Sequence, residues 1–130
     1  MSNQIYIPGV CNIGPAEIRT RRITGYVGLA ITILAFIIFY FTPVDAVVRL
    51  LVYIPAAIAA TGLLQAQLHF CAKFGMQGLF NFGNSIGHTE SVDQADYRRK
   101  DQRKAIIIIA GSAAIGLAVA LVAYWLPFAN

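Results

Sequence analysis

Three long apolar stretches, separated by polar segments, dominate the chain: residues 23–41, about 47–70 and 105–126. The hydrocarbon core of a bilayer is about 30 Å thick, and about 20 helical residues cross it at roughly 1.5 Å each. None of the stretches shows the 3.6-residue alternation of apolar and polar positions that a helix on a soluble domain shows. The pattern therefore predicts an all-α membrane protein with three transmembrane helices.

The first two helices are predicted to form a hairpin that occupies residues 23–70. Thr42 and Pro43 end the first helix, because a proline and the residue before it both disfavour helix. The very short turn that follows forces the second helix back beside the first. Pro55 is predicted to kink the second helix, and Arg49 to lie near the outer headgroups, four residues after Asp45.

Three polar or mixed segments complete the organisation. Residues 1–22 form an N-terminal arm, 71–104 a connecting segment, and 127–130 a short external tail. The phenylalanines and glycines of 71–87 predict an interfacial or a re-entrant element, and these alternatives stay open. The third helix is predicted to begin near Val92 and to project from the membrane.

Composition and charge agree with a membrane protein and orient it. Of 130 residues, 58% are hydrophobic and 12% are charged, whereas a soluble domain has about 25% charged residues. The net charge of +4 comes from residues beside the apolar stretches, which predicts contact with anionic phospholipids and excludes a nucleic-acid partner. Because lysine and arginine stay on the cytoplasmic side, we expect a multi-pass protein of the bacterial inner membrane with its N-terminus in the cytoplasm and its C-terminus outside. The membrane-anchoring residues, with two aromatic residues at the outer interface, are predicted to be Arg19, Arg21, Arg22, Lys73, Arg98, Arg99, Lys100, Arg103, Lys104, Tyr124 and Trp125.

Small residues recur at four-residue spacing in two of the predicted helices. Such residues let membrane helices approach closely, either within one chain or between copies. The predicted helix-packing residues are Thr24, Gly28, Ser112, Gly116 and Ala120.

The segment before the first helix resembles the entry of the YgaP-like transmembrane domain, a family of small bacterial inner-membrane hairpin proteins. That family looks like Asn-x-Gly-x-x-acid-Arg-x-x-Arg-x-x-x-Gly at this place. The matching positions here are Asn12, Gly14, Glu17, Arg21 and Gly25. The first arginine of the pattern is replaced by Ile18, with Arg19 one step along.

A second motif follows the hairpin, where the family looks like Cys-Pro-x-Tyr-x-x-x-Gly. Cys71 and Gly78 match it, while its proline and tyrosine are replaced by Ala72 and Phe74. The two motifs span residues 12 to about 81, so the third helix lies outside the resemblance. The resemblance implies a two-helix hairpin that associates with other membrane helices and, in members fused to a rhodanese, a link to sulfur transfer.

The candidate chemistry centres on Cys71, whose thiol a nearby Lys73 or His69 can activate. Cys11 is the second residue of this possible thiol site. Two cysteines and two histidines do not have the spacing of a known zinc site, so no metal is predicted. No cofactor is predicted either, although His69 leaves haem or a pigment open.

The sequence predicts a non-enzymatic structural or accessory subunit that packs against copies of itself or a larger membrane protein complex. It holds no hydrolytic triad, nucleotide loop or paired carboxylates within the spans. The N-terminal arm, with Tyr6, Ile7 and Pro8, is long enough to reach a neighbour. The alternatives are a thiol- or sulfur-handling membrane component that uses Cys71, and an oligomeric channel or carrier for a small solute.

Overall fold

The computed structural model describes residues 6–127 and is mostly helical. Three helical segments are each long and apolar enough to cross a membrane. The second segment consists of two α-helices joined by a 3₁₀ turn. The segments are α1 (Pro15–Phe41), then α2 (Ala46–Arg49), η1 (Leu50–Val52) and α3 (Tyr53–Leu68), and finally α5 (Ala95–Trp125).

Helix α1 begins at Pro15, well before the predicted start at residue 23. Proline suits the first turn of a helix, because its missing N–H would have no partner there and its φ is already helical. The 27 residues of α1 measure about 40 Å, more than the roughly 30 Å of a bilayer core. About 20 residues counted back from Phe41 reach Arg22, so the basic first turns of α1 extend beyond the hydrocarbon.

The second segment changes its helical geometry at the predicted kink. The 3₁₀ turn η1 ends just before Pro55, whose ring removes the backbone donor that would bond the carbonyl of Leu51. Arg49 lies at the far end of the helices and donates from Nη1 to the backbone oxygens of Ala123 (2.7 Å) and Leu126 (3.1 Å). The arginine therefore satisfies carbonyls at the C-terminal end of α5, where helices lack internal donors.

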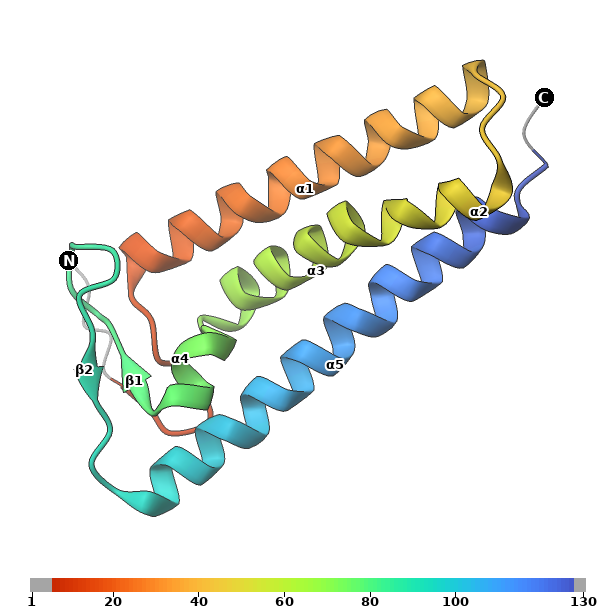
Figure 1. Ribbon diagram of the computed structural model, residues 1–130. Coiled ribbons are helices and arrows are strands. Elements are labelled where there is room, and N and C mark those ends of the chain that lie inside the picture. The colour runs from red at the N-terminus through yellow and green to blue at the C-terminus, as the bar shows by residue number, and fades with distance from the viewer. Residues whose placement is uncertain (1–5, 128–130) are drawn as a thin grey trace.

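The three segments pack with α3 in the middle, flanked by α1 on one side and α5 on the other (Figure 1). The connecting segment folds at one end of this layer into α4 (Ala72–Gln77) and two short antiparallel strands, β1 (Leu79–Phe80) and β2 (Glu90–Ser91). This strand pair is an addition to the expected all-helical fold. Helix α5 begins at Ala95, close to the predicted start at Val92. The segment predicted as interfacial or re-entrant thus contains a short helix and the first strand of the antiparallel pair.

Glycines bring α1 and α3 together until their backbones touch. A Cβ atom added at Gly62 would lie 2.5 Å from the nitrogen of Gly25, and one added at Gly28 would lie 2.7 Å from the nitrogen of Ala59. Because the colliding atoms belong to backbone, no side-chain rotation relieves the clash. Thr24 does not share this contact, since it is exposed and its hydroxyl donates to the Thr20 carbonyl.

The small residues of α5 face α3 inside the same chain. Ser112 and Ala120 are buried, and a Cβ atom added at Gly116 would lie 3.1 Å from the Ala57 Cβ and from the Tyr53 ring. This stripe is therefore occupied internally and leaves no room for a second copy at the same surface.

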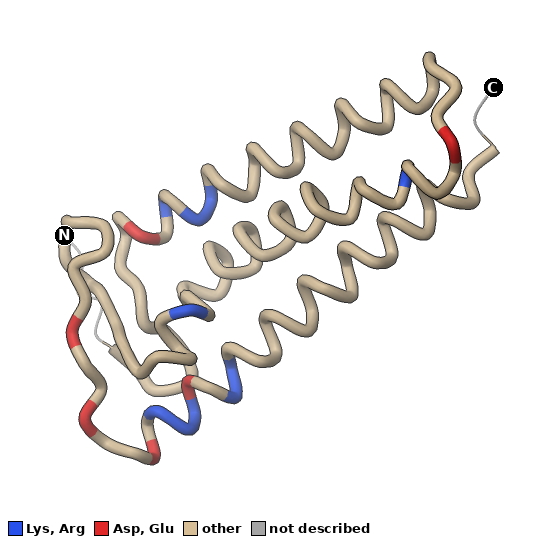
Figure 2. The backbone as a smooth tube through the Cα atoms, in the orientation of Figure 1, with Lys and Arg blue, Asp and Glu red and all other residues tan. Residues whose placement is uncertain are grey.

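Charged side chains lie at the two ends of the layer, and the middle of each span is free of them (Figure 2). Most charged residues gather at the end that holds the short strands, whereas Asp45 and Arg49, at the two ends of α2, lie at the other. The outward faces between these ends carry large exposed apolar side chains, such as Leu34, Ile54 and Leu117. This distribution is what helices surrounded by hydrocarbon require.

Candidate functional site

Cys71 lies between the end of α3 and the start of α4. It is enclosed by residues before α1 and in the first turns of α1. Its side chain is 1% exposed. The amide of Asn12 holds its backbone from both sides, because Asn12 Nδ2 donates to the Cys71 carbonyl (3.1 Å) and the Cys71 N–H donates to Asn12 Oδ1 (2.7 Å). Nη2 of Arg21 lies 3.0 Å from the Cys71 sulfur. The sulfur is therefore held in a fixed position against a guanidinium.

Glu17 holds Arg21 in this position from one turn earlier on α1. Its carboxylate is 1% exposed, and Oε1 lies 3.4 Å from Arg21 Nη2. The other oxygen, Oε2, accepts hydrogen bonds from Asn81 Nδ2 (2.9 Å) and from the Gly87 N–H (2.8 Å). The guanidinium also lies over the ring of Phe74, 5.8 Å from its centroid. These contacts on several sides hold the Arg21 side chain in one rotamer, with its guanidinium against the sulfur.

Backbone hydrogen bonds explain how three distant segments meet here. His69 ends α3 in the left-handed conformation, with φ of 55°, and its carbonyl accepts from the Asn12 N–H. Asn81 then donates its N–H to the Asn12 carbonyl (2.9 Å) and accepts from the Gly14 N–H (2.8 Å). The segment before α1 is thus bonded to the residues after α3 and to those after β1, and the site forms where the three join.

A groove of about 700 Å³ opens beside Cys71, along α3 and between α1, α4 and α5. We call it the cysteine groove. Its lining includes Glu17, Arg21, Ala57, Ile58, Gln65, Cys71, Lys73 and Ile109. A second groove of about 550 Å³, the alanine groove, is lined by Arg22, Ala56, Ala60, Leu63, Gln67 and Ile115. The α3 residues of the two grooves alternate at helical spacing, so the grooves lie on opposite faces of α3.

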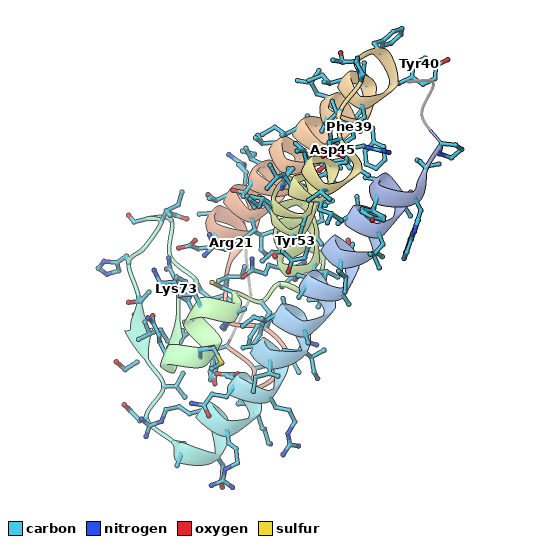
Figure 3. The ribbon with its side chains drawn as sticks, turned by 45° about the vertical axis from the view of Figure 1, so that its right-hand side comes forward. Arg21, Phe39, Tyr40, Asp45, Tyr53 and Lys73 are labelled. Atoms are coloured by element: carbon cyan, nitrogen blue, oxygen red, sulfur yellow. The ribbon has the colours of Figure 1, made fainter. Side chains whose placement is uncertain are left out.

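The positive charge at the cysteine groove comes from two elements. Arg21 on α1 and Lys73 on α4 are labelled in Figure 3 at the same end of the helix layer, while Phe39 and Asp45 mark the other end. The Arg21 guanidinium contacts the sulfur directly, and Lys73 lines the same groove. The arrangement can therefore support attack by sulfur on an electrophilic sulfur or carbon atom.

The other predicted thiol and ligand residues have different positions. Cys11 is partly exposed on the N-terminal arm, whereas Cys71 is buried. His69 and His88 are exposed. Within residues 6–127, no group of three histidine, cysteine or acidic side chains is placed to hold a metal ion.

The predicted anchoring residues are mostly exposed at the ends of the helices. Arg21 and Lys104 are partly buried, and Tyr124 packs edge-on against the exposed ring of Trp125 at a centroid distance of 5.5 Å. The remaining basic residues, exposed to solvent or headgroups, are Arg19, Arg22, Lys73, Arg98, Arg99, Lys100 and Arg103.

The N-terminal arm docks on its own chain through a residue that the sequence did not single out. Asp101, on the first turns of α5, is fully buried and accepts hydrogen bonds from the Tyr6 hydroxyl (2.5 Å) and the Gly9 N–H (2.7 Å). The Tyr6 ring stacks on Phe80 at a centroid distance of 4.8 Å. Burial, followed by the hydrogen bond and the charge of Asp101, raises the pKa of Tyr6 well above its usual value. Of the arm residues expected to reach a neighbour, Tyr6 is thus engaged within the chain, and Ile7 is exposed.

Asn12, Glu17 and Asn81 organise the site, and sequence reasoning gave none of them a role. Asn12 and Glu17 did belong to the first motif, which marked their positions but did not indicate what their side chains contact. Asn81 carried no signal, because nothing in its neighbourhood distinguishes it from a loop asparagine.

No protein family, no curated protein and no solved structure matches the chain. What the site does is therefore inferred from its geometry and from the chemistry of its side chains.

Proposed function

We propose that the chain is a small multi-pass membrane protein that handles sulfur compounds through Cys71. The observation that carries this proposal is the 3.0 Å contact between Arg21 Nη2 and the Cys71 sulfur, at the wall of a groove that both residues line. Asn12 and Glu17 act as positioning residues, the first for the cysteine backbone and the second for the guanidinium. A structural cysteine needs no such fixed cation.

The reaction that suits this site is thiol exchange. The Cys71 thiolate attacks one sulfur of a disulfide or persulfide, an S–S bond to Cys71 forms, and the other sulfur leaves as a thiolate that takes up a proton. A second thiol then releases Cys71 by the same step in reverse. Electrons balance without an added oxidant or reductant, so the site needs no cofactor for this step.

We also propose that the chain is a distant member of the YgaP-like transmembrane family. In support, matched residues of the two motifs meet in space: Asn12, Glu17 and Arg21 from the first surround Cys71 from the second. The gathering of basic residues at one end of the layer supports a cytoplasmic location for that end, with the C-terminus outside the bacterial inner membrane.

The proposed reactivity is tested by the rate at which Cys71 is alkylated. Iodoacetamide is added at neutral pH to the purified protein in detergent, in a Cys11→Ser background. Replacing Arg21 by Gln removes the charge beside the sulfur, which is expected to slow alkylation by at least about tenfold, since a hydrogen bond to a charged group contributes about 1.5–3 kcal/mol. Arg22→Gln is the matched control, because Arg22 is on the same turn but faces the alanine groove. Equal rates in the two variants would contradict a role for Arg21 in activating the thiol.

The second candidate function is a structural subunit without chemistry of its own. The alanine groove favours it, because its floor of small residues on α3 is open between α1 and α5 and has the character of a helix-docking surface. Native mass spectrometry of the protein extracted in mild detergent tests this candidate. Association with copies of the chain or a larger complex that is lost in Ala60→Leu, with Cys71 chemistry unchanged, supports it; a monomer contradicts it.

A further inference from the structure

The cysteine groove is polar at one end and apolar along the rest of its length. Arg21 and Lys73 lie at the end of the helix layer that holds α4 (Figure 3), and Cys71, just before α4, lines the same groove. From there the groove follows α3 from Gln65 to Ala57. These two residues are eight positions apart, which is about 12 Å along a helix. The groove therefore extends from the level of the headgroups into the depth of the hydrocarbon core.

The apolar part of the groove faces sideways and is not sealed. Ile58 is 45% exposed on α3, Ile109 is 50% exposed on α5, and both line the groove. In a membrane these side chains are in contact with lipid, so a molecule dissolved in the bilayer can slide between them. A water-soluble substrate has no need of this part of the groove.

The charged residues that line the cysteine groove have one positive charge in excess. Arg21 and Glu17 form an ion pair, so together they are neutral. Within residues 6–127, Lys73 makes no ion pair, and it is exposed at the rim of the same groove. An ammonium at a membrane surface attracts anionic groups. The excess charge favours a negatively charged headgroup beside Cys71.

We propose that the substrate of Cys71 is an amphipathic sulfur compound that enters from the membrane, with an anionic head at Lys73 and an apolar tail between Ile58 and Ile109. This inference rests on the proposed sulfur chemistry and names its substrate class. The lysine draws the head to the rim, and the tail occupies the apolar length of the groove. The sulfur atom of such a molecule then lies beside the thiolate that Arg21 holds.

Protection of Cys71 from a small alkylating reagent measures whether such a molecule binds. N-ethylmaleimide is added to the full-length protein in phosphatidylcholine nanodiscs, with oleate, oleyl alcohol or butyrate present. Cys11, which is partly exposed on the N-terminal arm of the same molecule, is the internal reference for the concentration of the reagent. Oleate is expected to lower the ratio of Cys71 to Cys11 alkylation about fivefold, and oleyl alcohol less, because a charge attracted at a membrane surface contributes about 1 kcal/mol. Butyrate is expected to leave the ratio unchanged.

Two variants test the head and the tail separately, each with a matched control. Lys73→Gln is expected to make oleate no better than oleyl alcohol, whereas Lys100→Gln, away from the groove, changes nothing. Ile58→Trp fills the apolar length and is expected to abolish protection by both long-chain compounds. Its control is Ile115→Trp, which is equally exposed but lines the alanine groove.

The same ratio in phosphatidylglycerol nanodiscs, without additive, separates two sources of an anionic amphiphile. Protection there means that a bilayer phospholipid also occupies the groove, while protection by oleate alone points to a free amphiphile, and both outcomes support the site. No protection in either arm, or protection by oleate that Ile58→Trp leaves intact, overturns the inference. The proposed function fails on a different result, namely equal alkylation of the Arg21→Gln and Arg22→Gln variants without any amphiphile.

Discussion

The close backbone contact between α1 and α3 gives a sharp stability prediction. Replacing Gly62 by Ala adds one methyl group that would lie 2.5 Å from the Gly25 nitrogen and 2.7 Å from the Arg21 carbonyl oxygen. Since both are backbone atoms, the helices must separate, and overpacking of this kind costs about 1–3 kcal/mol. Alanine is better than glycine in a helix by about 1 kcal/mol, which offsets part of the loss. We expect a net loss of up to about 2 kcal/mol in the free energy of unfolding.

Gly111→Ala is the matched control, because its added Cβ atom meets only Leu64 Cδ1 at 3.9 Å. It keeps the gain in helix propensity without the clash, so it is expected to be neutral or up to about 1 kcal/mol more stable. Both variants are unfolded by titration with sodium dodecyl sulfate in mixed micelles and followed by near-ultraviolet circular dichroism. A Gly62→Ala protein as stable as Gly111→Ala would refute the backbone contact between α1 and α3.

Three further predictions concern the ends of the helices. Raising the pH above about 10 is expected to destabilise the wild type more than Tyr6→Phe in thermal unfolding. The pKa of Tyr6 is raised in the folded state, so its contribution to the free energy of unfolding is complete below the pKa of tyrosine in the unfolded chain. That contribution is lost as the phenol ionises at higher pH. Glu17→Gln is expected to lower the stability by about 1–3 kcal/mol, because bonds to a buried charged group are lost, whereas Glu90→Gln, at an exposed position, has no effect in the same titration. An alkaline phosphatase fused after the last residue is expected to be active, as a C-terminus outside the cytoplasm requires; an inactive fusion that is stably inserted would reverse the proposed orientation.

The helical spans could be predicted because each depends on a local property of the chain. A run of apolar residues long enough to cross a bilayer is visible without any knowledge of what it packs against. The start of α1 was missed for the same reason: Pro15 to Arg22 is polar, and a search for apolar runs does not see the helical turns that continue beyond the hydrocarbon.

The packing residues show where a periodic pattern stops being informative. Gly28 and the stripe of Ser112, Gly116 and Ala120 do lie between helices, but spacing alone gave Thr24 the same weight although it is exposed. Nor could spacing show that α5 packs on α3 of its own chain, since an identical stripe serves contacts between chains. That choice depends on how the third helix is positioned by the turns before it.

The site itself depends on contacts between segments far apart in the sequence. Arg21 was predicted to anchor the chain at the headgroups and Cys71 to be activated by Lys73 or His69. The structure adds a contact between the arginine and the sulfur, and His69 ends α3 in a left-handed turn. Only the convergence of the segments before α1, after α3 and after β1 makes this neighbourhood, and no local pattern encodes it.

The most direct test of sulfur handling is to identify the group that Cys71 carries in the membrane of the cells that make the protein. Cells are lysed in the presence of excess iodoacetamide, and the peptides around Cys71 and Cys11 are then analysed by mass spectrometry without reduction. A fraction of Cys71 is expected to bear an additional sulfur or a mixed disulfide, whereas Cys11 is not. Arg21→Gln is expected to abolish this fraction and Arg22→Gln to retain it. Plain alkylation of both cysteines in every sample would contradict sulfur handling through Cys71.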